Sequence, residues 1–383
     1  MKKKIVSVLM STLMVSALLA GCGSSSSTTA EATDDTATET AEATDDAATE
    51  EDVEEVTTDS GETISVGFSQ VGAESDWRTA NTESMKSTFS DENGYTLTFD
   101  DAQQKQENQI TAIRNFIQQE VDYIVLAPVT ETGWDTVLQE AKDAGIPVII
   151  VDRIVDVSDD SLFTAWVGSD FLAEGNKACE WLNAFATAKG VDAADIHIAD
   201  IQGTIGASAQ IGRTNGLNNA VEKYGWDLVA QQTGEFTQAK GQEVMESLLK
   251  QYDNINVVYC ENDNEAFGAI DALTAAGKTV GSDIANGEVM VMSFDSTNAG
   301  LNDVLSTKIT LDTECNPLHG PRVEEIIKKL QAGETVDHLQ YVDESMFAVD
   351  DTVKSVDAAN SLDETVTYDV TPVTQEVIDG RAY

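Results

Sequence analysis

Tyr123-Ile124-Val125-Leu126-Ala127 and Pro147-Val148-Ile149-Ile150-Val151 are two short apolar runs that decide the fold of this chain. Continuous apolar runs of this length are typical of strands that are buried on both faces. The segment between them, 134–144, has the pattern of a helix, and Gly145 is typical of the residue that ends one. A strand, a helix and a second strand in this order predict a parallel sheet that helices cover on both faces.

The same alternation continues on both sides of these runs. Before them, strands are expected at 64–68 and 95–99, and helices at 77–89 and 106–117. After them the pattern restarts, with expected strands at 196–201, 228–232, 257–260 and 289–294 and expected helices at 170–185, 208–224, 238–251 and 265–276. Val71-Gly72-Ala73 leads to Arg78, and Ile205-Gly206-Ala207 leads to Arg213 in the same way. We therefore expect two α/β lobes, each with its ligand-facing loops at the carboxyl ends of its strands.

The N-terminus has the pattern of an export signal. Lys2-Lys3-Lys4 precede an apolar run, 5–19, and small residues then lead to Cys22. This order resembles a bacterial lipoprotein signal, in which residues 1–21 are removed and Cys22 receives a diacylglyceryl group. A plain signal peptide with a chance cysteine is the alternative. A transmembrane anchor is disfavoured, because the run is shorter than the roughly 20 residues that span a bilayer.

The next segment, 22–62, is acidic and has no Lys, Arg or aromatic residue. It buries too little apolar surface to offset the entropy of ordering, so we expect a disordered tether; a specific acidic binding motif is the alternative. The whole chain has 22 Lys and Arg against 68 Asp and Glu, a net charge of −46. This balance argues against a nucleic-acid partner, which needs a basic face. Cys179, Cys260 and Cys315 are far apart and odd in number, so no disulfide framework is expected.

Polar and aromatic side chains follow the expected strands in both lobes. Carboxylate and amide oxygens accept hydrogen bonds from sugar hydroxyls, and Arg and Asn side chains donate them. An aromatic ring covers the apolar face of a sugar ring. The set therefore predicts a sugar site, although each Asp or Asn alone is also typical of a helix cap or turn, and Arg153 alone of a surface ion pair. Its members are Trp77, Arg78, Asp152, Arg153, Thr204, Phe236, Asn262 and Asp295.

Longer stretches of the chain resemble the periplasmic sugar-binding proteins of ABC transporters, the ribose-binding-like family, and within it the galactofuranose-binding type. The resemblance covers most of residues 63–347. It rests on Val66-Gly67-Phe68-Ser69-Gln70-Val71-Gly72, Trp77-Arg78, the run 103–110, Ala127-Pro128-Val129, Thr132-Gly133-Trp134, Asp152-Arg153, Gln202-Gly203-Thr204, Gly206-Ala207-Ser208 and the run 243–247.

This resemblance implies the two-lobed type I periplasmic-binding-protein fold, with three hinge segments and the ligand enclosed between the lobes. The lobes expected are 63–165 with 315–345 and 166–314 with 346–383. To the site residues above, the resemblance adds Arg213 and Glu314. Glu314 lies three residues before Pro317, as in the galactofuranose-binding type, but the general ribose-binding pattern differs there. The acidic segment 348–365 lies beyond the resemblance and receives no role.

No enzyme motif accounts for these residues. There is no Walker loop and no calcium loop, and His197, His319 and His338 lack metal-ligand spacing. We therefore expect no catalytic residue, cofactor or metal. The expected function is that of a monomeric, extracytoplasmic solute-binding lipoprotein, held by lipid to the outer face of the cell membrane. It captures a monosaccharide (galactofuranose or a similar aldose) by lobe closure and delivers it to the permease subunits of an ABC importer. The alternatives are a sensor that feeds a chemoreceptor or histidine kinase and, less favoured, a surface glycosidase that uses Asp152 and Asp295.

Overall fold

The two apolar runs form neighbouring parallel strands, β3 (Tyr123–Leu126) and β4 (Val148–Val151), in the computed structural model, which describes residues 63–383. Ile124 and Leu126 pack with α3 (Asp135–Asp143) on one face of the sheet. Val125 belongs to a second apolar cluster on the opposite face. Burial on both faces explains why these strands are apolar at every position.

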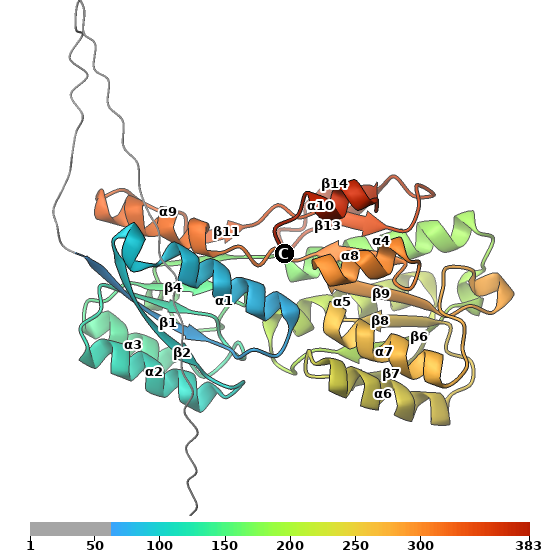
Figure 1. The fold of residues 1–383 in the computed structure, drawn as a ribbon, viewed down its shortest axis with the longest axis horizontal. Helices are drawn as coiled ribbons and strands as arrows, with labels where there is room; N and C mark the ends of the chain where they lie inside the picture. Colours follow the sequence, from blue (N-terminus) through green and yellow to red (C-terminus); the bar gives the residue numbers. More distant parts are fainter. Residues whose placement is uncertain (1–62) are drawn as a thin grey trace, which may run out of the picture. The chain divides into compact units, whose positions relative to one another are not determined.

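The first lobe is built on a six-stranded sheet of order β11-β5-β4-β3-β1-β2, in which every neighbouring pair is parallel (Figure 1). Its other strands are β1 (Ile64–Gln70), β2 (Tyr95–Asp101), β5 (Ala165–Gly168) and β11 (Leu339–Tyr341). Its other α-helices are α1 (Asp76–Thr88), α2 (Gln106–Gln118) and α9 (Gly320–Gln331).

The second lobe is built on an eight-stranded sheet of order β13-β14-β12-β10-β9-β8-β6-β7. The run from β7 to β10 is parallel, whereas β12 lies antiparallel to β10 and β13 antiparallel to β14. The strands are β6 (His197–Gln202), β7 (Asp227–Thr233), β8 (Val257–Cys260), β9 (Met290–Asp295), β10 (Leu311–Glu314), β12 (Met346–Ala348), β13 (Ser355–Ala359) and β14 (Thr365–Pro372). The α-helices are α4 (Phe171–Ala188), α5 (Ser208–Tyr224), α6 (Gln238–Gln251), α7 (Asp263–Ala275), α8 (Asn298–Leu305) and α10 (Gln375–Asp379).

The predicted fold of two α/β lobes with parallel sheets is confirmed, and the strands beyond β10 extend the second sheet as a mixed edge. One predicted boundary needs correction. Residues 166–168 were expected in the second lobe, but they complete β5 and pair within the first sheet. The acidic segment 348–365 runs from the end of β12 to the start of β14 and includes β13. Its Ala359 carbonyl accepts a hydrogen bond from Asn176 of α4 at 2.9 Å.

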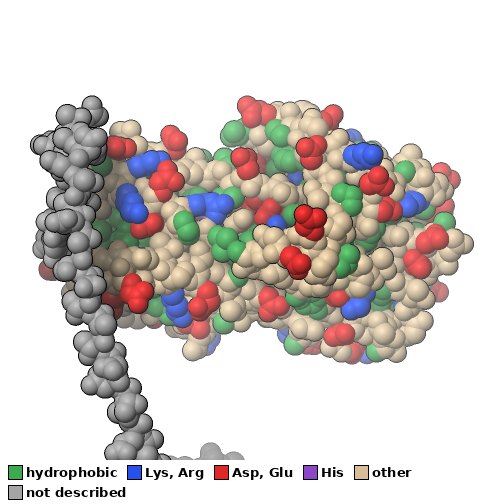
Figure 2. Space-filling view, turned by 45° about the horizontal axis from the view of Figure 1, so that its top comes forward, with side chains coloured by type: hydrophobic (Ala, Val, Ile, Leu, Met, Phe, Trp, Pro, Cys, Tyr) green, Lys and Arg blue, Asp and Glu red, His purple; other side chains and the backbone are tan. Residues whose placement is uncertain are grey.

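The chain passes between the lobes in three crossing segments. They are 169–170 between β5 and α4, 315–319 between β10 and α9, and 342–345 between β11 and β12. Among the described residues, no helix is long and apolar enough to cross a membrane. On the face drawn in Figure 2, Lys and Arg side chains lie scattered among Asp and Glu side chains.

Candidate functional site

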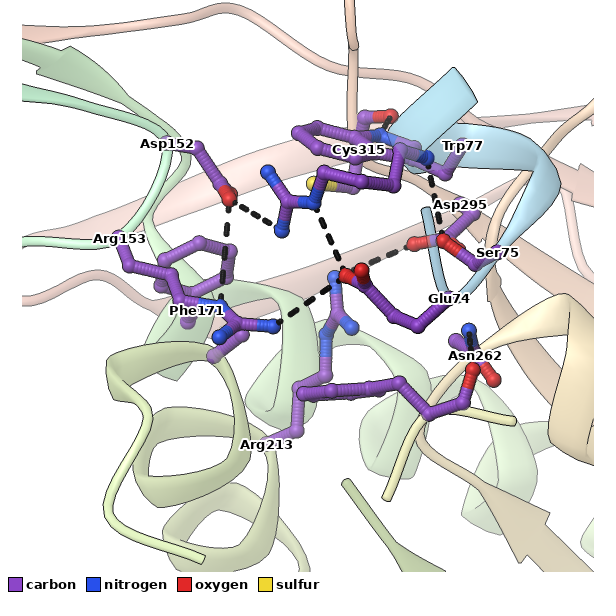
Figure 3. A pocket seen from close by; sticks show the side chains of 13 residues that line it. Glu74, Ser75, Trp77, Asp152, Arg153, Phe171, Arg213, Asn262, Asp295 and Cys315 are labelled. Atoms are coloured by element: carbon purple, nitrogen blue, oxygen red, sulfur yellow. Dashed lines mark hydrogen bonds and ion pairs between the residues drawn. The ribbon is translucent and has the colours of Figure 1, made fainter. Parts of the chain in front are cut away.

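Eight of the predicted site residues line one cavity between the lobes (Figure 3). The first-lobe residues follow strands β1 and β4. Those of the second lobe follow β6, β7 and β8, except that Asp295 is the last residue of β9. The carboxyl ends of both parallel sheets therefore face this cavity, as expected for ligand sites in α/β folds. The eight residues are Trp77, Arg78, Asp152, Arg153, Arg213, Phe236, Asn262 and Asp295.

Two guanidinium groups and two carboxylates of the first lobe form a buried ion-pair network. Arg78 Nη2 lies 2.8 Å from Asp152 Oδ2, and Arg78 Nε donates to Glu74 Oε1 at 2.9 Å. Arg153 Nη2 lies 3.9 Å from the same Glu74 oxygen, and Arg153 Nε lies 4.0 Å from Asp152 Oδ2. These side chains are at most 4% exposed. Charges so far from water need partners, so the network holds all four groups in place.

The network decides which groups donate and which accept hydrogen bonds. Burial alone would raise the pKa of Asp152, but the charges of Arg78 and Arg153 outweigh it and hold that pKa below its ordinary value. Burial and the nearby charge of Arg78 lower the pKa of Arg153 to about 10. At neutral pH, Asp152 is therefore an acceptor, and both arginines are donors.

The second lobe contributes Asp295, whose pKa is shifted in the opposite direction to that of Asp152. Arg213 Nε donates to Glu174 Oε2 at 2.7 Å, and Arg213 Nη2 lies 3.7 Å from Asp295 Oδ1. Burial raises the pKa of Asp295 well above its ordinary range, and Arg213 offsets this only in part. Asp295 is therefore more easily protonated than Asp152, whose ionised carboxylate only accepts hydrogen bonds.

An aromatic ring lies beneath each arginine of the cavity. The guanidinium carbon of Arg78 is 4.6 Å from the Trp77 ring centroid, and that of Arg153 is 5.1 Å from Phe236. Arg213 lies over Phe171 at 5.4 Å. Such stacking fixes the plane of a guanidinium group and therefore the direction of its N–H bonds.

The backbone is strained at three of these positions. Asp152, Phe236 and Asp295 have φ angles of 62°, 59° and 108°, in a region that non-glycine residues rarely adopt. Gly203 allows the close approach of Phe236, because a Cβ atom at Gly203 would lie 1.9 Å from the Phe236 ring. Strain of this kind persists only where the surrounding structure enforces it, and it concentrates at functional sites.

Asn262 is both a helix cap and a cavity residue. Its Oδ1 accepts a hydrogen bond from the backbone N–H of Glu265 at 2.8 Å, which caps α7. Its Nδ2 donates to the Phe236 carbonyl at 3.1 Å. The cap alternative is therefore correct for Asn262, and the same side chain also fixes the Phe236 loop.

Little free space remains between these side chains. The cavity volume is about 20 Å³, which is room for a single water molecule. A larger ligand can enter only when the lobes move apart or when side chains such as Glu74 turn away.

Thr204 and Glu314, also predicted as site residues, do not line this cavity. Thr204 lies half-buried in the turn between β6 and α5. The Glu314 carboxylate faces the C-terminus instead, where it accepts from Tyr383 Oη at 2.6 Å and from Arg381 Nη2 at 3.0 Å. At the end of β10, the residue that lines the cavity is therefore the next one, Cys315.

Five lining residues were not predicted: Glu74, Ser75, Phe171, Ala209 and Cys315. Glu74 and Ser75 lie in the first loop, and the Ser75 hydroxyl caps α1 by accepting from the Arg78 N–H at 3.1 Å. Cys22, the predicted lipidation site, lies outside the described residues.

Comparisons with known proteins agree with this architecture. The sequence profile described as the periplasmic binding protein domain matches residues 66–311. The chain is 45% identical over 230 residues to the galactofuranose-binding protein YtfQ of Escherichia coli (strain K12), covering 59% of this chain and 70% of that protein. A Mycobacterium smegmatis structure in complex with β-D-fucofuranose is similar, with a TM-score of 0.70, 43% identity, and coverage of 74% of this chain and 91% of the other. The binding protein of the arabinose ABC transporter from Shewanella sp. ANA-3, bound to α- and β-L-arabinofuranose, has a TM-score of 0.68 and 42% identity, with coverage of 74% and 92%.

Proposed function

Since the chain belongs to the family of the periplasmic binding protein domain, we propose that it captures a monosaccharide between its lobes and delivers it to an ABC importer. The proposed ligand is a furanose sugar, with galactofuranose first. The relatives support this choice, because the sugars named for three of them are galactofuranose, β-D-fucofuranose and L-arabinofuranose, which share a five-membered ring.

The observation that carries the proposal is the pair of unlike carboxyl groups in one buried cavity. Asp152 is ionised and accepts hydrogen bonds, whereas burial raises the pKa of Asp295 and favours the protonated form, which can donate one. A sugar hydroxyl both donates and accepts, so it pairs with either group. The guanidinium groups add further donors, and Trp77 and Phe236 offer apolar faces for the C–H side of the sugar ring.

Lobe closure is the proposed mechanism of capture. Three hydrogen bonds join the loops of the two lobes: Asp76 N–H to Asn264 Oδ1 at 3.0 Å, Ile154 N–H to Ser208 Oγ at 3.0 Å, and Glu131 N–H to the Gly206 carbonyl at 2.9 Å. We propose that opening about the three crossing segments breaks these bonds and makes room for the sugar. The sugar then favours closure by as much as its affinity for the closed form exceeds that for the open form.

Calorimetric titration against a panel of monosaccharides tests the proposal. The panel contains galactofuranose, L-arabinose, D-ribose and D-galactose held as a methyl pyranoside. We expect galactofuranose to bind with a dissociation constant below about 1 mM, since weaker binding leaves less than about 4 kcal/mol of affinity. If none of these sugars binds, the proposal is wrong. Binding of the pyranoside alone would reject the furanose assignment and keep sugar capture.

A surface glycosidase is the second candidate, because such enzymes use a pair of carboxyl groups, and Asp152 and Asp295 both line the cavity. Against it stand the arginines, since a guanidinium beside each carboxyl group disfavours proton transfer to the ligand. Incubation with a chromogenic galactofuranoside separates the two functions. We expect no release of chromophore, and turnover that Asp152→Asn abolishes would establish the enzyme instead.

The N-terminal pattern supports a proposal for the location of the protein. We propose that Cys22 is lipidated, that residues 22–62 are a tether, and that the sugar-binding lobes lie outside the cell membrane. Membrane fractionation tests this part separately. The wild-type chain is expected in the membrane fraction and Cys22→Ala in the soluble fraction, and an equal distribution of both would exclude the anchor.

A further inference from the structure

The three crossing segments meet at one cluster of side chains. Ser169 comes from the first segment, Cys315 from the second and Glu344 from the third. Ser169 Oγ lies 3.3 Å from Cys315 Sγ and donates to Glu344 Oε1 at 2.6 Å. Glu174, from the first turn of α4, completes the cluster from the side of the second lobe.

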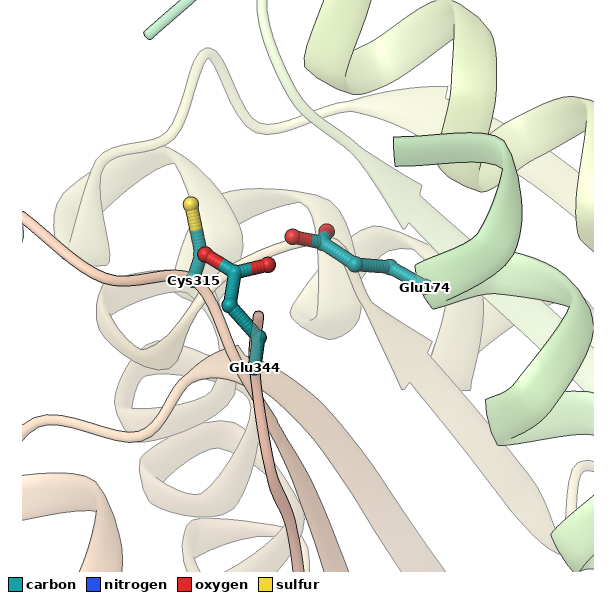
Figure 4. A group of neighbouring side chains, drawn as sticks. All are labelled: Glu174, Cys315 and Glu344. Carbon is teal, nitrogen blue, oxygen red and sulfur yellow. The ribbon is translucent and has the colours of Figure 1, made fainter. Parts of the chain in front are cut away.

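Three of these side chains carry atoms that bind metal ions. The Cys315 sulfur and one carboxylate oxygen each of Glu174 and Glu344 all lie within 4.8 Å of one another (Figure 4). Ligands of a tetrahedral zinc ion lie about 3.5 Å apart, given bonds of about 2.0–2.3 Å. Side-chain shifts of about 1 Å would therefore bring the three atoms to that spacing.

The Glu174 carboxylate gives independent support for a ligand here. Glu174 is 1% exposed, and its Oε1 has no hydrogen-bond partner, whereas its Oε2 accepts from Arg213. Figure 4 shows this carboxylate pointing at Glu344 and Cys315. A buried oxygen without a partner costs about 1–3 kcal/mol, which a bound cation would recover.

The charges around the cluster also favour a cation. A bound cation would displace the thiol proton, and the three ligands would then carry three negative charges, which Arg213 and Lys177 offset only in part. Arg213 bonds to Glu174 at 2.7 Å, and Lys177 Nζ reaches the Glu344 carbonyl at 3.3 Å. Glu344 also lines a second cavity of about 490 Å³, together with Asp170, Asp343 and Asp369, which offers an acidic route to the cluster.

We propose that Cys315, Glu174 and Glu344 bind a thiophilic divalent cation, Zn²⁺, at the junction of the three crossing segments. A thiolate beside two carboxylates is a zinc-type ligand set, because sulfur disfavours Mg²⁺ and Ca²⁺. A bound ion would tie two crossing segments to the second lobe. The proposed metal site adjoins the sugar cavity, because Cys315 also lines that cavity and Glu174 pairs with Arg213. Cadmium binding can nevertheless be tested without any sugar.

The test is a titration of the full-length, reduced and chelator-treated protein with Cd²⁺ alone. A cadmium–thiolate bond gives an ultraviolet charge-transfer band that carboxylate binding does not. We expect the wild type to need one more equivalent of Cd²⁺ than Cys315→Ser before the band saturates. Any other cysteine is present in both proteins, so its contribution cancels in this comparison. Glu344→Gln, which keeps the acceptor for Ser169, should weaken binding at least tenfold.

Cys179→Ser is the matched control, since Cys179 is an equally buried thiol that the proposed site does not use. It should bind Cd²⁺ as the wild type does. Thermal unfolding confirms that each variant is folded. The proposal is overturned if wild type and Cys315→Ser give the same band, or if Glu344→Gln binds as tightly as the wild type. In either case the three side chains do not form the proposed zinc site.

Discussion

Arg78 on helix α1 and Asp152 at the end of strand β4 form a buried ion pair, with Arg78 Nη2 and Asp152 Oδ2 2.8 Å apart. The pair joins two loops of the first lobe and keeps Asp152 ionised. Arg153 is the second cation near this carboxylate. The proposed sugar site therefore depends on a charge balance that is present before any ligand arrives.

Replacing Asp152 by Asn tests this balance. Asp152→Asn keeps the size of the side chain but leaves Arg78 and Arg153 with Glu74 as their remaining carboxylate partner. We expect the affinity for the sugar to fall at least about 100-fold and the free energy of unfolding to fall by about 3 kcal/mol. Calorimetry and urea unfolding measure the two effects. Asp91→Asn, an exposed change in the same lobe, should alter neither, and unchanged sugar affinity in Asp152→Asn would remove Asp152 from the site.

Because Asp200 on β6 is buried, we expect the stability of the protein to fall as the pH rises. Asp200 is fully buried, its Oδ2 accepts from Gln231 at 3.0 Å, and its Oδ1 has no partner. Burial raises the pKa of Asp200 from 3.8 to about 8. Between about pH 4 and pH 8 the folded protein holds a proton that the unfolded chain has released. Stability should therefore fall as the pH rises through this window, by up to about 1.4 kcal/mol per pH unit for this one proton.

Asp200→Asn removes this titration. The variant should be more stable than the wild type at pH 7, and its stability should depend less on pH between 5 and 8. Urea unfolding at several pH values measures both curves. Asp253→Asn, at an exposed position of the same lobe, should follow the wild type. Parallel curves for Asp200→Asn and the wild type would show that Asp200 is ionised in the folded protein.

The sequence predicts the buried parallel strands well, because their side chains are apolar on both faces. The predicted strand 257–260 coincides with β8, whose four residues are all buried. Strand β10 escaped prediction, because Leu-Asp-Thr-Glu has a polar pattern although all four residues are buried. Its Asp312 Oδ1 accepts from the N–H and hydroxyl of Ser296 at 3.0 and 3.1 Å, and this partner becomes visible only in the folded chain.

The residues of the candidate site also fall into two groups: those that the sequence predicts and those that become evident only in the folded chain. Residues that directly follow apolar strands, such as Asp152 and Asp295, are predictable from the rule that ligands bind at carboxyl strand ends. Glu74 has no such signal, because it lies within a polar loop and meets Arg153 only through the fold. Glu314 was predicted from the resemblance to the galactofuranose-binding type, but the direction of its side chain depends on Arg381 and Tyr383 at the far end of the chain.

Replacing Gly203 by Ala should also weaken sugar binding, in this case through a steric clash. A Cβ atom at Gly203 would lie 1.9 Å from the Phe236 ring, so Gly203→Ala must displace that ring. We expect a loss of about 1–3 kcal/mol in stability from overpacking and a fall in sugar affinity of at least about tenfold. Gly380→Ala is the control, because its added Cβ meets its nearest neighbour at an ordinary 3.4 Å. Full sugar affinity in Gly203→Ala would show that the position of Phe236 is unimportant for the ligand.

Substitutions at Glu314 can show whether this residue stabilises the fold or binds the sugar. Its carboxylate accepts from Tyr383, Arg381 and the Ser345 N–H, the last at 2.9 Å. Burial opposes ionisation, but the bonds from Tyr383 and Arg381 outweigh it and lower the pKa of Glu314. A lowered pKa means that these bonds stabilise the fold above the unfolded pKa and that this contribution is lost as the pH falls through the folded pKa.

Glu314→Gln and Tyr383→Phe should therefore reduce stability and leave sugar binding intact. We expect Glu314→Gln to unfold at a lower temperature than the wild type at pH 7, with a difference that shrinks as the pH falls through the lowered pKa of Glu314. Tyr383→Phe, which loses the hydrogen bond to Glu314 and the one from Arg381, should cost about 1–3 kcal/mol. Sugar affinity should stay within about threefold of wild type in both variants, as measured by calorimetry. A tenfold loss of affinity in Glu314→Gln without a loss in Tyr383→Phe would instead make Glu314 a direct ligand of the sugar, as the family resemblance implied.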